Sequence, residues 1–271
     1  MVHALDGRQQ LQRYGRDDSE VIWSIHRGDL NITLLDLAER AGATLHFHRR
    51  LDTVDFDAHT VRFGDEQDGS VHAVNFTALI GADGVKSVVR QALIGDPARV
   101  TGHVVYRAVV DKADFPEDLR WNAASIWVGP NCHLVHYPLR GGEQYNVVVT
   151  FHSRETEEWG VKDGSKEEVL SYFQGICPKA RKLIELPKSW KRWATADRDP
   201  IGRWSFGRVT LLGDAAHPTT QYMAQGACMA IEDAVTLGEA LRAHGGAIEP
   251  ALDLYQRSRI ARTARIVLSS R

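Results

Sequence analysis

The sequence predicts an α/β fold with a β-rich insertion in the middle of the chain. Two observations support this prediction. At 78–94 and again at 208–246, a buried-strand pattern is followed by a turn and then by a helical pattern, which is typical of α/β proteins. Between about 100 and 155, half-buried strand patterns are separated by Pro, Asn and Gly-Gly turns. The order is therefore α/β, then β-rich, then α/β again.

Composition excludes several classes of protein. The chain has 271 residues, with 33 Lys and Arg against 35 Asp and Glu, and a formal net charge of −2. This length fits one large domain or two coupled ones, and the near-neutral charge argues against a nucleic-acid partner. No stretch approaches the roughly 18 apolar residues that span a bilayer, and no apolar signal segment opens the chain. Three widely spaced cysteines suit a reducing compartment, so we expect a cytoplasmic protein without an integral membrane segment.

The first third of the chain begins with a polar segment. Residues 1–20 are weakly periodic and carry no strand pattern, which indicates an irregular arm or a short helix. A helix is expected over 26–42, where apolar residues recur at helical spacing and Gly42 closes the pattern. Apolar alternation then predicts strands at 44–49, 51–56, 60–63 and 71–84. A short helix is expected at 86–94.

The middle of the chain is rich in predicted strands. Alternating residues place them at 102–110, 124–129, 132–139 and 144–153. A helix follows at 165–176, because Ser165 and Glu168 form a capping-box pattern. Pro178 and Pro187 then interrupt the chain, and no further element is predicted before about residue 200.

The last third returns to an α/β pattern. A strand is predicted at 208–214, and helices are predicted from about Gln225 onward and over 250–270. These shifts divide the chain into three parts, at 1–98, 99–200 and 201–271. The first and third parts are expected to form one domain, with the second part as a separate β-sheet domain.

A Gly-Asp pair closes the strand at 208–214. Asp214 is then expected at the carboxyl edge of a sheet, where α/β folds bind ligands, and its carboxylate can accept hydrogen bonds from a sugar hydroxyl. Gly226 lies at the expected start of the next helix, whose free N–H groups and positive dipole end suit an anionic or electron-rich ligand. A Gly-Asp pair that only caps a turn explains the pattern equally well.

The strand at 71–84 ends in a similar turn, in the order Asp83-Gly84. Gly84 can adopt a positive φ and allow the backbone to approach a ligand. Asp83 can orient a basic side chain, with Arg27 and Arg90 as candidates. Because Asp-Gly is among the commonest turn signals, a purely structural turn is the alternative.

Together, the two turn segments resemble a known family. Residues 81–90 (GADGVKSVVR) are similar to the Asp-Gly motif of flavoprotein aromatic hydroxylases, and residues 207–241 to their Gly-Asp motif and following helix. Both motifs in this order, with a β-rich segment between them, are specific to single-component FAD-dependent monooxygenases. The resemblance covers residues 20–271. Within the family, the β-rich part and TQYMAQGACMA (220–230) look most like 3-hydroxybenzoate 6-hydroxylases, and salicylate hydroxylases are the nearest competitors.

The resemblance implies an FAD-binding, Rossmann-like domain joined to a β-sheet substrate domain. It implies FAD as cofactor, NADH or NADPH as co-substrate, and an aromatic acid and O₂ as substrates. The implied reaction converts 3-hydroxybenzoate to 2,5-dihydroxybenzoate through a flavin C4a-hydroperoxide, in the catabolism of aromatic compounds. A decarboxylating hydroxylation of salicylate is the alternative, and a homodimer is left open.

Seven positions match cofactor-binding positions of the family. Arg27 matches an arginine that contacts FAD, Leu51 a position near the adenine-ribose end, and Asp83 the aspartate linked to flavin and NAD(P)H binding. Asp214 matches the aspartate that binds the ribityl chain. The remaining matches lie at the helix start that meets the flavin: Gly226, Ala227 and Cys228.

Three further positions match substrate-pocket residues of the family, namely His133, Tyr137 and Gln221. In a strand, His133 and Tyr137 share one face with Val135, and His136 points to the other face. Removing a phenol proton activates the ring carbons ortho and para to the oxygen, and a histidine is a suitable general base for this step. Gln221 could hydrogen-bond the phenol or the carboxylate, and Tyr137 could bind the carboxylate or line the ring. A histidine that only occupies a strand is the alternative for His133.

Other candidates are weaker. His46 and His48 alternate on one predicted strand and could pair as metal ligands, but no third ligand lies near them in the sequence, so no metal site is expected. Cys132 would be a nucleophile only if its thiol were exposed and its pKa lowered.

The chain departs from the family in one respect. The family begins with a strand, GxGxxG and a helix, which cradle the dinucleotide pyrophosphate, and no GxGxxG occurs in these 271 residues. We therefore expect a truncated or partial form of a longer enzyme. A non-catalytic remnant that binds an aromatic acid or flavin is the alternative to an active hydroxylase.

Overall fold

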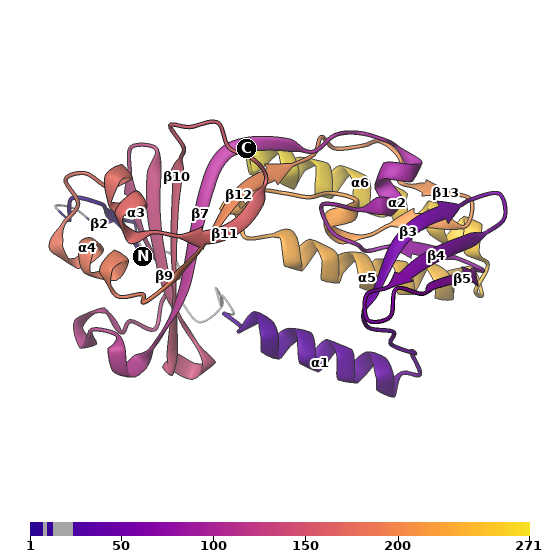
Figure 1. Cartoon of the computed structure of the whole chain (residues 1–271), viewed down its shortest axis with the longest axis horizontal. Coiled ribbons are helices and arrows are strands. Elements are labelled where there is room, and N and C mark those ends of the chain that lie inside the picture. Colours follow the sequence, from indigo (N-terminus) through magenta and orange to yellow (C-terminus); the bar gives the residue numbers. More distant parts are fainter. Residues whose placement is uncertain (8–9, 13–23) are drawn as a thin grey trace. The chain divides into compact units, whose positions relative to one another are not determined.

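The computed structural model describes residues 1–7, 10–12 and 24–271 (Figure 1). Its two compact units each have their own sheets and hydrophobic core. The first unit comprises Met1–Thr44 and Val100–Thr195, and the second comprises Leu45–Arg99 and Ala196–Arg271. The predicted α/β fold with a β-rich insertion is confirmed. That the outer thirds of the chain bind FAD and the middle third binds substrate stays a prediction.

An eight-stranded sheet organises the first unit. In spatial order its strands are β11 (Gly160–Gly164), β12 (Trp190–Asp197), β7 (Arg99–Asp111), β10 (Gln144–His152), β9 (Cys132–Leu139), β8 (Ser125–Gly129), β1 (Val2–Ala4) and β2 (Gln10–Gln12). The neighbours β7, β10, β9 and β8 are antiparallel, whereas β1 runs parallel to β8. Antiparallel neighbours need only tight connections, which explains the Pro, Asn and Gly-Gly turns of this segment.

One face of this sheet packs against two helices, α3 (Lys166–Tyr172) and α4 (Pro178–Glu185). Alternate strand residues enter the core because successive side chains of a strand point to opposite faces. The core includes these fully buried residues from strands and helices: Leu134, Val147, Val149, Val169 and Leu183. The intervening residues of β9 and β10 therefore lie on the opposite face of the sheet.

Helix α1 (Arg27–Arg40) confirms the helix predicted over 26–42. None of its residues is buried, and Leu34 and Leu37 of the apolar spacing are 48% and 53% exposed. Asp29 accepts two hydrogen bonds from Arg140, at 2.9 and 2.7 Å. This bidentate pair joins the first turn of α1 to the turn that follows β9.

The second unit has two small sheets. In spatial order these are β13 (Ser205–Phe206), β14 (Val209–Leu211) and β6 (Leu79–Gly81), and β3 (Arg49–Asp55), β4 (Thr60–Asp65) and β5 (Val71–Asn75). Strand β14 runs parallel to β6, so both carboxyl ends reach the same edge of the sheet. The helices of this unit are α2 (Val88–Leu93), α5 (Gly226–Ala243) and α6 (Ile248–Ser269). The core of this unit includes Val89, Trp204, Leu211, Leu252 and Tyr255.

Short 3₁₀ turns complete the helical elements of the described residues. They are η1 (Lys112–Asp114), η2 (Glu117–Leu119), η3 (Arg140–Gly142), η4 (Gly213–Ala215) and η5 (Gln221–Met223). Two of these turns, η4 and η5, lie in the segment between β14 and α5, which carries the Gly-Asp motif.

Two predictions for the first third are wrong. Strands β1 and β2 occur where an arm or short helix is predicted over 1–20, although 8–9 and 13–20 lie outside the described residues. Strand β1 depends on its pairing with β8, which is a tertiary interaction that local sequence does not show. The strand predicted at 44–49 is also absent, since β3 begins only at Arg49. His48 has a φ of 58°, and this left-handed backbone cannot continue a strand.

The predictions around the two prolines are also wrong. Pro178 begins helix α4 as its first residue, a position where the missing N–H costs nothing because it would have no partner in the helix. Strand β12 follows, where the sequence predicts no element. The predicted strand at 71–84 is in fact two strands, β5 and β6.

Candidate functional site

The Gly-Asp turn places a carboxylate beside the start of a long helix. Gly213 has a φ of 61°, and Asp214 follows it in η4. A Cβ added to Gly226 would lie 3.9 Å from Asp214 Oδ1 and 3.5 Å from Thr219 Cγ2. The structure therefore brings Asp214 and the first residue of α5 together, as the sequence predicts, and the glycine leaves room between them.

The N-terminus of α5 is available to a ligand. The helix has 18 residues, and its N-cap, Gln225, makes no side-chain capping hydrogen bond. Ala227 and Cys228 in the first turn lie at the surface. Free N–H groups and the positive end of the helix dipole stabilise an electron-rich group placed there. These features fit a flavin cofactor, with Asp214 as acceptor for hydroxyl groups and α5 as the donor of backbone hydrogen bonds.

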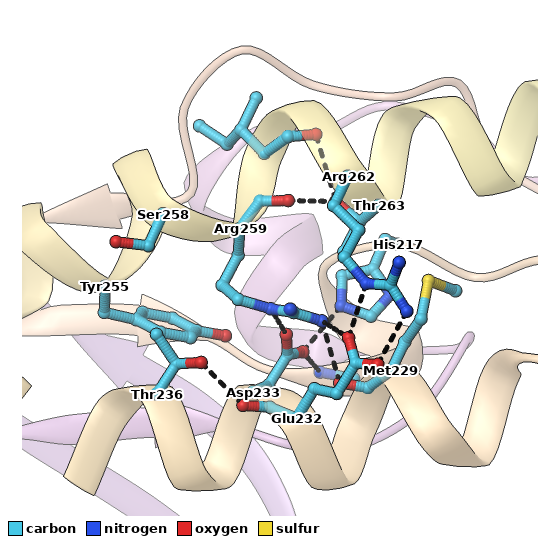
Figure 2. A network of polar contacts seen from close by, with 12 residues as sticks. His217, Met229, Glu232, Asp233, Thr236, Tyr255, Ser258, Arg259, Arg262 and Thr263 are labelled. Atoms are coloured by element: carbon cyan, nitrogen blue, oxygen red, sulfur yellow. Dashed lines mark hydrogen bonds and ion pairs between the residues drawn. The ribbon is translucent and has the colours of Figure 1, made fainter. Parts of the chain in front are cut away.

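The buried carboxylate of Asp233 holds the backbone of the Gly-Asp turn in place. Figure 2 shows Asp233 with two of its partners, His217 and Arg259. Asp233, in the middle of α5, is fully buried. Its Oδ2 accepts hydrogen bonds from the Gly213 N–H at 2.9 Å and from His217 Nε2 at 2.6 Å. Arg259 Nε of α6 donates to Oδ1 at 2.7 Å. Asp233 thereby holds the backbone directly before Asp214 in place.

Figure 2 shows Asp233 and its neighbour Glu232 beside Arg259 and Arg262. Their partners keep both carboxylates ionised. Burial alone would raise the pKa of Asp233, but hydrogen bonds from His217 and then Arg259 bring it below its usual value. Hydrogen bonds from Arg262 and Arg259 lower the pKa of Glu232 to about 2, against the opposing effect of burial. The sequence patterns do not predict this network. An acidic residue in the middle of an apolar helix is the signal that could have identified Asp233.

The Asp-Gly turn has a structural role in the folded chain. Asp83 accepts hydrogen bonds from Ser87 Oγ at 2.5 Å and from the Val88 N–H at 2.7 Å, and Ser87 caps α2 by accepting from the Arg90 N–H at 2.9 Å. Gly84 has a φ of 76°, as expected. Asp83 therefore stabilises the start of α2.

Arg90 does not pair with Asp83, contrary to one of the two alternatives from the sequence. This arginine is fully buried and forms a bidentate pair with Asp96, at 2.8 and 2.6 Å. It also donates to the carbonyl oxygens of Ala215 and Ala216, at 3.1 and 2.8 Å. Arg90 thus connects the helix after the Asp-Gly motif to the residues directly after Asp214.

The two remaining candidate cofactor residues lie in different units. Arg27 is exposed at the first position of α1, in the first unit. Leu51 lies on β3 in the second unit, where it is partly buried and packs against the hydrophobic core. Their contacts to FAD stay predictions.

The predicted arrangement of the β9 histidines is confirmed. Cys132, Leu134 and His136 are buried on the core face, whereas His133 and Tyr137 alternate with them on the opposite face and are half-buried. We call this opposite face the outer face. Its residues on the two central strands are His133, Val135 and Tyr137 of β9, and Asn146, Val148 and Thr150 of β10.

The environment of His133 keeps its imidazole neutral. Burial, and secondarily the nearby His103, lower the pKa of His133 below its usual value. The pKa of His103 is lowered in the same way, by burial and by His152, whose ring centroid lies 5.0 Å away. A neutral imidazole at pH 7 can accept a proton, which is the state that a general base requires.

Gln221 belongs to the second unit, in η5. Its Nε2 atom is buried and has no hydrogen-bond partner in the described structure. Burial raises the pKa of the adjacent Tyr222 to about 12, so its hydroxyl stays protonated. The Gln221 side chain opposes this rise through a hydrogen bond with Tyr222, and its hydrogen bond to a substrate stays a prediction.

The weaker candidates lose support. Cys132 is buried and burial raises its pKa, which is the opposite of what a nucleophilic thiol needs. Among the described residues, no group of three or more His, Cys, Asp or Glu side chains could hold a metal ion. None of the described helices combines the length and the apolar character required to cross a bilayer.

The sequence is similar to known proteins over most of its length. A family model described as FAD binding domain matches residues 9–270. A 3-hydroxybenzoate 6-hydroxylase of Polaromonas naphthalenivorans (strain CJ2) is 71% identical over 248 residues, 91% of this chain. The chain covers 61% of the length of that relative. The 3-hydroxybenzoate 6-hydroxylase 2 of Aquipseudomonas alcaligenes is 69% identical over 92% of this chain, which covers 77% of that protein.

Solved structures show the same fold. Klebsiella pneumoniae HpxO complexed with FAD and uric acid matches with a TM-score of 0.72 at 29% identity, over 90% of this chain and 61% of that one. A salicylate hydroxylase substrate complex matches with a TM-score of 0.73 at 26% identity, over 90% of this chain and 64% of that one. The predicted resemblance to flavoprotein aromatic hydroxylases is thereby confirmed. The chain belongs to the FAD binding domain family.

Proposed function

We propose that this chain is part of an FAD-dependent aromatic-ring monooxygenase that converts 3-hydroxybenzoate to 2,5-dihydroxybenzoate. The co-substrates are NADH or NADPH and O₂. The observation that carries the proposal is the neutral, half-buried imidazole of His133 on the outer face, on the same side of β9 as Tyr137. The names of the two relatives at 71% and 69% identity support this substrate. A cytoplasmic location stays the expectation from cysteine usage, and a homodimer stays open.

The chain's own residues fit an FAD site. Asp214 would accept hydrogen bonds from the ribityl hydroxyls, and the N-terminal N–H groups of α5, at Gly226 to Cys228, would bind the electron-rich edge of the flavin ring. Bound FAD, reduced by NADH or NADPH, would activate O₂ so that one of its oxygen atoms enters the aromatic ring and the other leaves as water. The protein contributes the geometry, because Asp233 fixes the Gly213 backbone that directly precedes Asp214.

The proposed role of His133 is to remove the phenol proton. Its lowered pKa leaves the imidazole unprotonated at neutral pH, so it can accept the proton from the 3-hydroxyl group. The resulting negative charge spreads to the ring carbons ortho and para to the oxygen, and carbon 6 is the para carbon. Tyr137 would orient the ring by hydrogen bonds to the carboxylate or to the phenol oxygen, and the role of Gln221 stays a prediction from the resemblance.

A product assay tests this proposal. The purified chain is supplied with FAD, NADH and air, and is given 3-hydroxybenzoate or salicylate. We expect 2,5-dihydroxybenzoate from the first compound, measured by chromatography. Catechol formed from salicylate instead would identify a decarboxylating hydroxylase. Failure to retain flavin, together with no product from either compound, would support a non-catalytic remnant and would contradict the proposal.

A further inference from the structure

Two polar side chains of β10 are buried without hydrogen-bond partners. Thr150 is 1% exposed and Asn146 is 3% exposed. Neither Thr150 Oγ1 nor Asn146 Nδ2 has a partner in the described structure. Gln144 Oε1, at the start of β10, also has no partner, but the same side chain donates through Nε2 to Asp111 at 2.9 Å. A buried polar atom without a partner costs roughly 1–3 kcal/mol, so the atoms of Thr150 and Asn146 call for an explanation.

Both side chains lie on the outer face, directly beside the proposed catalytic residues. In the antiparallel register of β9 and β10, Thr150 is opposite His133 and Asn146 is opposite Tyr137. Paired residues of antiparallel strands point to the same face, with Cβ atoms about 4.5–5.5 Å apart. The adjacent β10 residues, such as Val147 and Val149, enter the core on the other face, which fixes the direction of Thr150 and Asn146.

An apolar pair separates the two polar pairs. Val135 is opposite Val148, and Val148 is 7% exposed. Along the strands, the outer face therefore has a polar pair, an apolar pair and a second polar pair. Four residues of a strand span about 13 Å, a length that suits a benzene ring with an oxygen substituent on each side and one hydrogen bond at each end.

The chemistry of the unpartnered atoms distinguishes the two ends. Asn146 Nδ2 can only donate hydrogen bonds, whereas a hydroxyl such as Thr150 Oγ1 can donate and accept. A carboxylate can only accept, so it fits the end with Asn146 and Tyr137. A phenol oxygen gives its proton to the base and is then negatively charged. It needs a hydrogen-bond partner both before and after this transfer, so it fits the end with Thr150 and His133.

We propose that Thr150 and Asn146 are substrate-binding residues that orient a hydroxylated aromatic acid on the outer face, over β9 and β10. Thr150 hydrogen-bonds the phenol oxygen whose proton His133 accepts, and donates to that oxygen once it is negatively charged. Asn146 donates to the carboxylate at the other end of the ring. This inference rests on the proposed function, since it assumes that a phenolic acid binds the outer face.

Isosteric substitutions provide the test. Thr150→Val and Asn146→Leu remove the unpartnered groups and keep the side-chain shapes close to the originals. Asn146→Leu is expected to weaken binding of 3-hydroxybenzoate by about 10- to 100-fold, the usual loss for one hydrogen bond to a charged group, and Thr150→Val by about 3- to 10-fold, the loss for a neutral one. Binding is measured by calorimetry on the purified chain supplied with FAD. The melting temperature is expected to stay equal or to rise, because no partnered hydrogen bond is lost.

Two controls separate binding from folding. Thr150→Ser keeps the hydroxyl and should bind 3-hydroxybenzoate within about threefold of the original chain. Ser125 is fully buried with an unpartnered Oγ, but it is paired with His136 on the core side of the sheet. Ser125→Ala should therefore leave binding unchanged.

Ligand analogues assign the two ends. Benzoate lacks the phenol oxygen, so Thr150→Val should not weaken its binding, whereas Asn146→Leu should. Phenol lacks the carboxylate, so Asn146→Leu should not weaken its binding, whereas Thr150→Val should. If the original chain binds 3-hydroxybenzoate and both variants bind it equally well, the inference is wrong and the proposed function stands. If the original chain binds none of these compounds, the proposed function itself is wrong.

Discussion

The Gly-Asp turn and the outer face of the large sheet use buried polar groups in opposite ways. At the turn, both oxygens of the buried Asp233 carboxylate accept hydrogen bonds, from Gly213, His217 and Arg259. On the outer face, Thr150 Oγ1 and Asn146 Nδ2 are equally buried and have no partner in the described structure. The Asp233 carboxylate thus has partners on both oxygens without a ligand, whereas the two outer-face atoms have none.

This difference indicates that the two regions have different roles, one structural and one in ligand binding. A buried carboxylate with partners on both oxygens rigidifies the backbone that it binds, and at the turn that backbone carries Asp214. Unpaired polar atoms destabilise the folded chain slightly but gain a partner when a ligand binds. Residues of the first kind should therefore mainly control stability, and residues of the second kind should mainly control binding and turnover.

The largest effect is expected for His133→Ala. Removing a general base typically lowers turnover by about 10²- to 10⁴-fold, and this loss should appear in hydroxylation of 3-hydroxybenzoate while the bound flavin content is unchanged. The control is His244→Ala, which removes the same ring from an exposed position at the end of α5. Unchanged turnover in His133→Ala would remove this residue from the mechanism.

Asp233→Ala should give the largest loss of stability. The substitution removes one of the two carboxylate partners of the buried Arg259 guanidinium and the acceptor of the Gly213 N–H and of His217, and breaking a buried ion pair costs about 3–5 kcal/mol. The free energy of unfolding in urea measures the loss. Arg257→Gln is the control, since Arg257 is 68% exposed in its pair with Asp253, and should change stability by less than about 0.5 kcal/mol. A comparable loss in the two variants would contradict the proposed role of the network.

A smaller loss is expected for Ser87→Ala. This change removes the N-cap of α2 and the hydrogen bond from Ser87 Oγ to Asp83. Loss of an N-cap costs about 0.5–2 kcal/mol, which thermal unfolding can detect. Ser258→Ala serves as the control, because this exposed serine of α6 only bonds the Leu254 carbonyl of its own helix. If Ser87→Ala melts at the temperature of the original chain, Asp83 does not depend on Ser87 to stabilise α2.

The smallest expected effect is a pH dependence from Glu232. Its pKa falls from 4.5 in the unfolded chain to about 2 in the folded chain. The stabilisation is therefore complete above pH 4.5 and is lost as the pH falls toward 2. Because the side chain is 34% exposed, solvent screening limits the contribution to about 0.2–1 kcal/mol. Glu232→Gln should lower stability at pH 7 and should differ less from the original chain at pH 3. A constant difference across this range would exclude the charge as the cause.

Local patterns in the sequence predict much of the fold. The strands of the β-rich segment and the helices from Gln225 and over 250–270 are confirmed as β7 to β10, α5 and α6. These elements are long and strongly periodic, so each element carries its own signal. Strand β12 and helix α4 are not predicted, because a proline usually interrupts an element, whereas Pro178 begins α4.

The site is predictable to the extent that its residues are close in the sequence. Gly213, Asp214 and Gly226 belong to one turn and helix, and the structure brings Asp214 near Gly226. The pairing of Asp83 with Arg90 is not confirmed, because Asp96 competes for the arginine. The sequence does not single out Asp233, since its role depends on a contact with Arg259 of another helix.

The sequence by itself determined the periodicity of the elements, the face shared by His133 and Tyr137, and membership of a flavoprotein family. Each of these follows from residues within one strand or one motif. Only the tertiary structure decided which groups are buried and which of them have partners. Asn146 and Thr150 are ordinary strand residues in the sequence, and they become candidates for substrate binding only because β9 and β10 pair in one register and leave their polar atoms buried without partners.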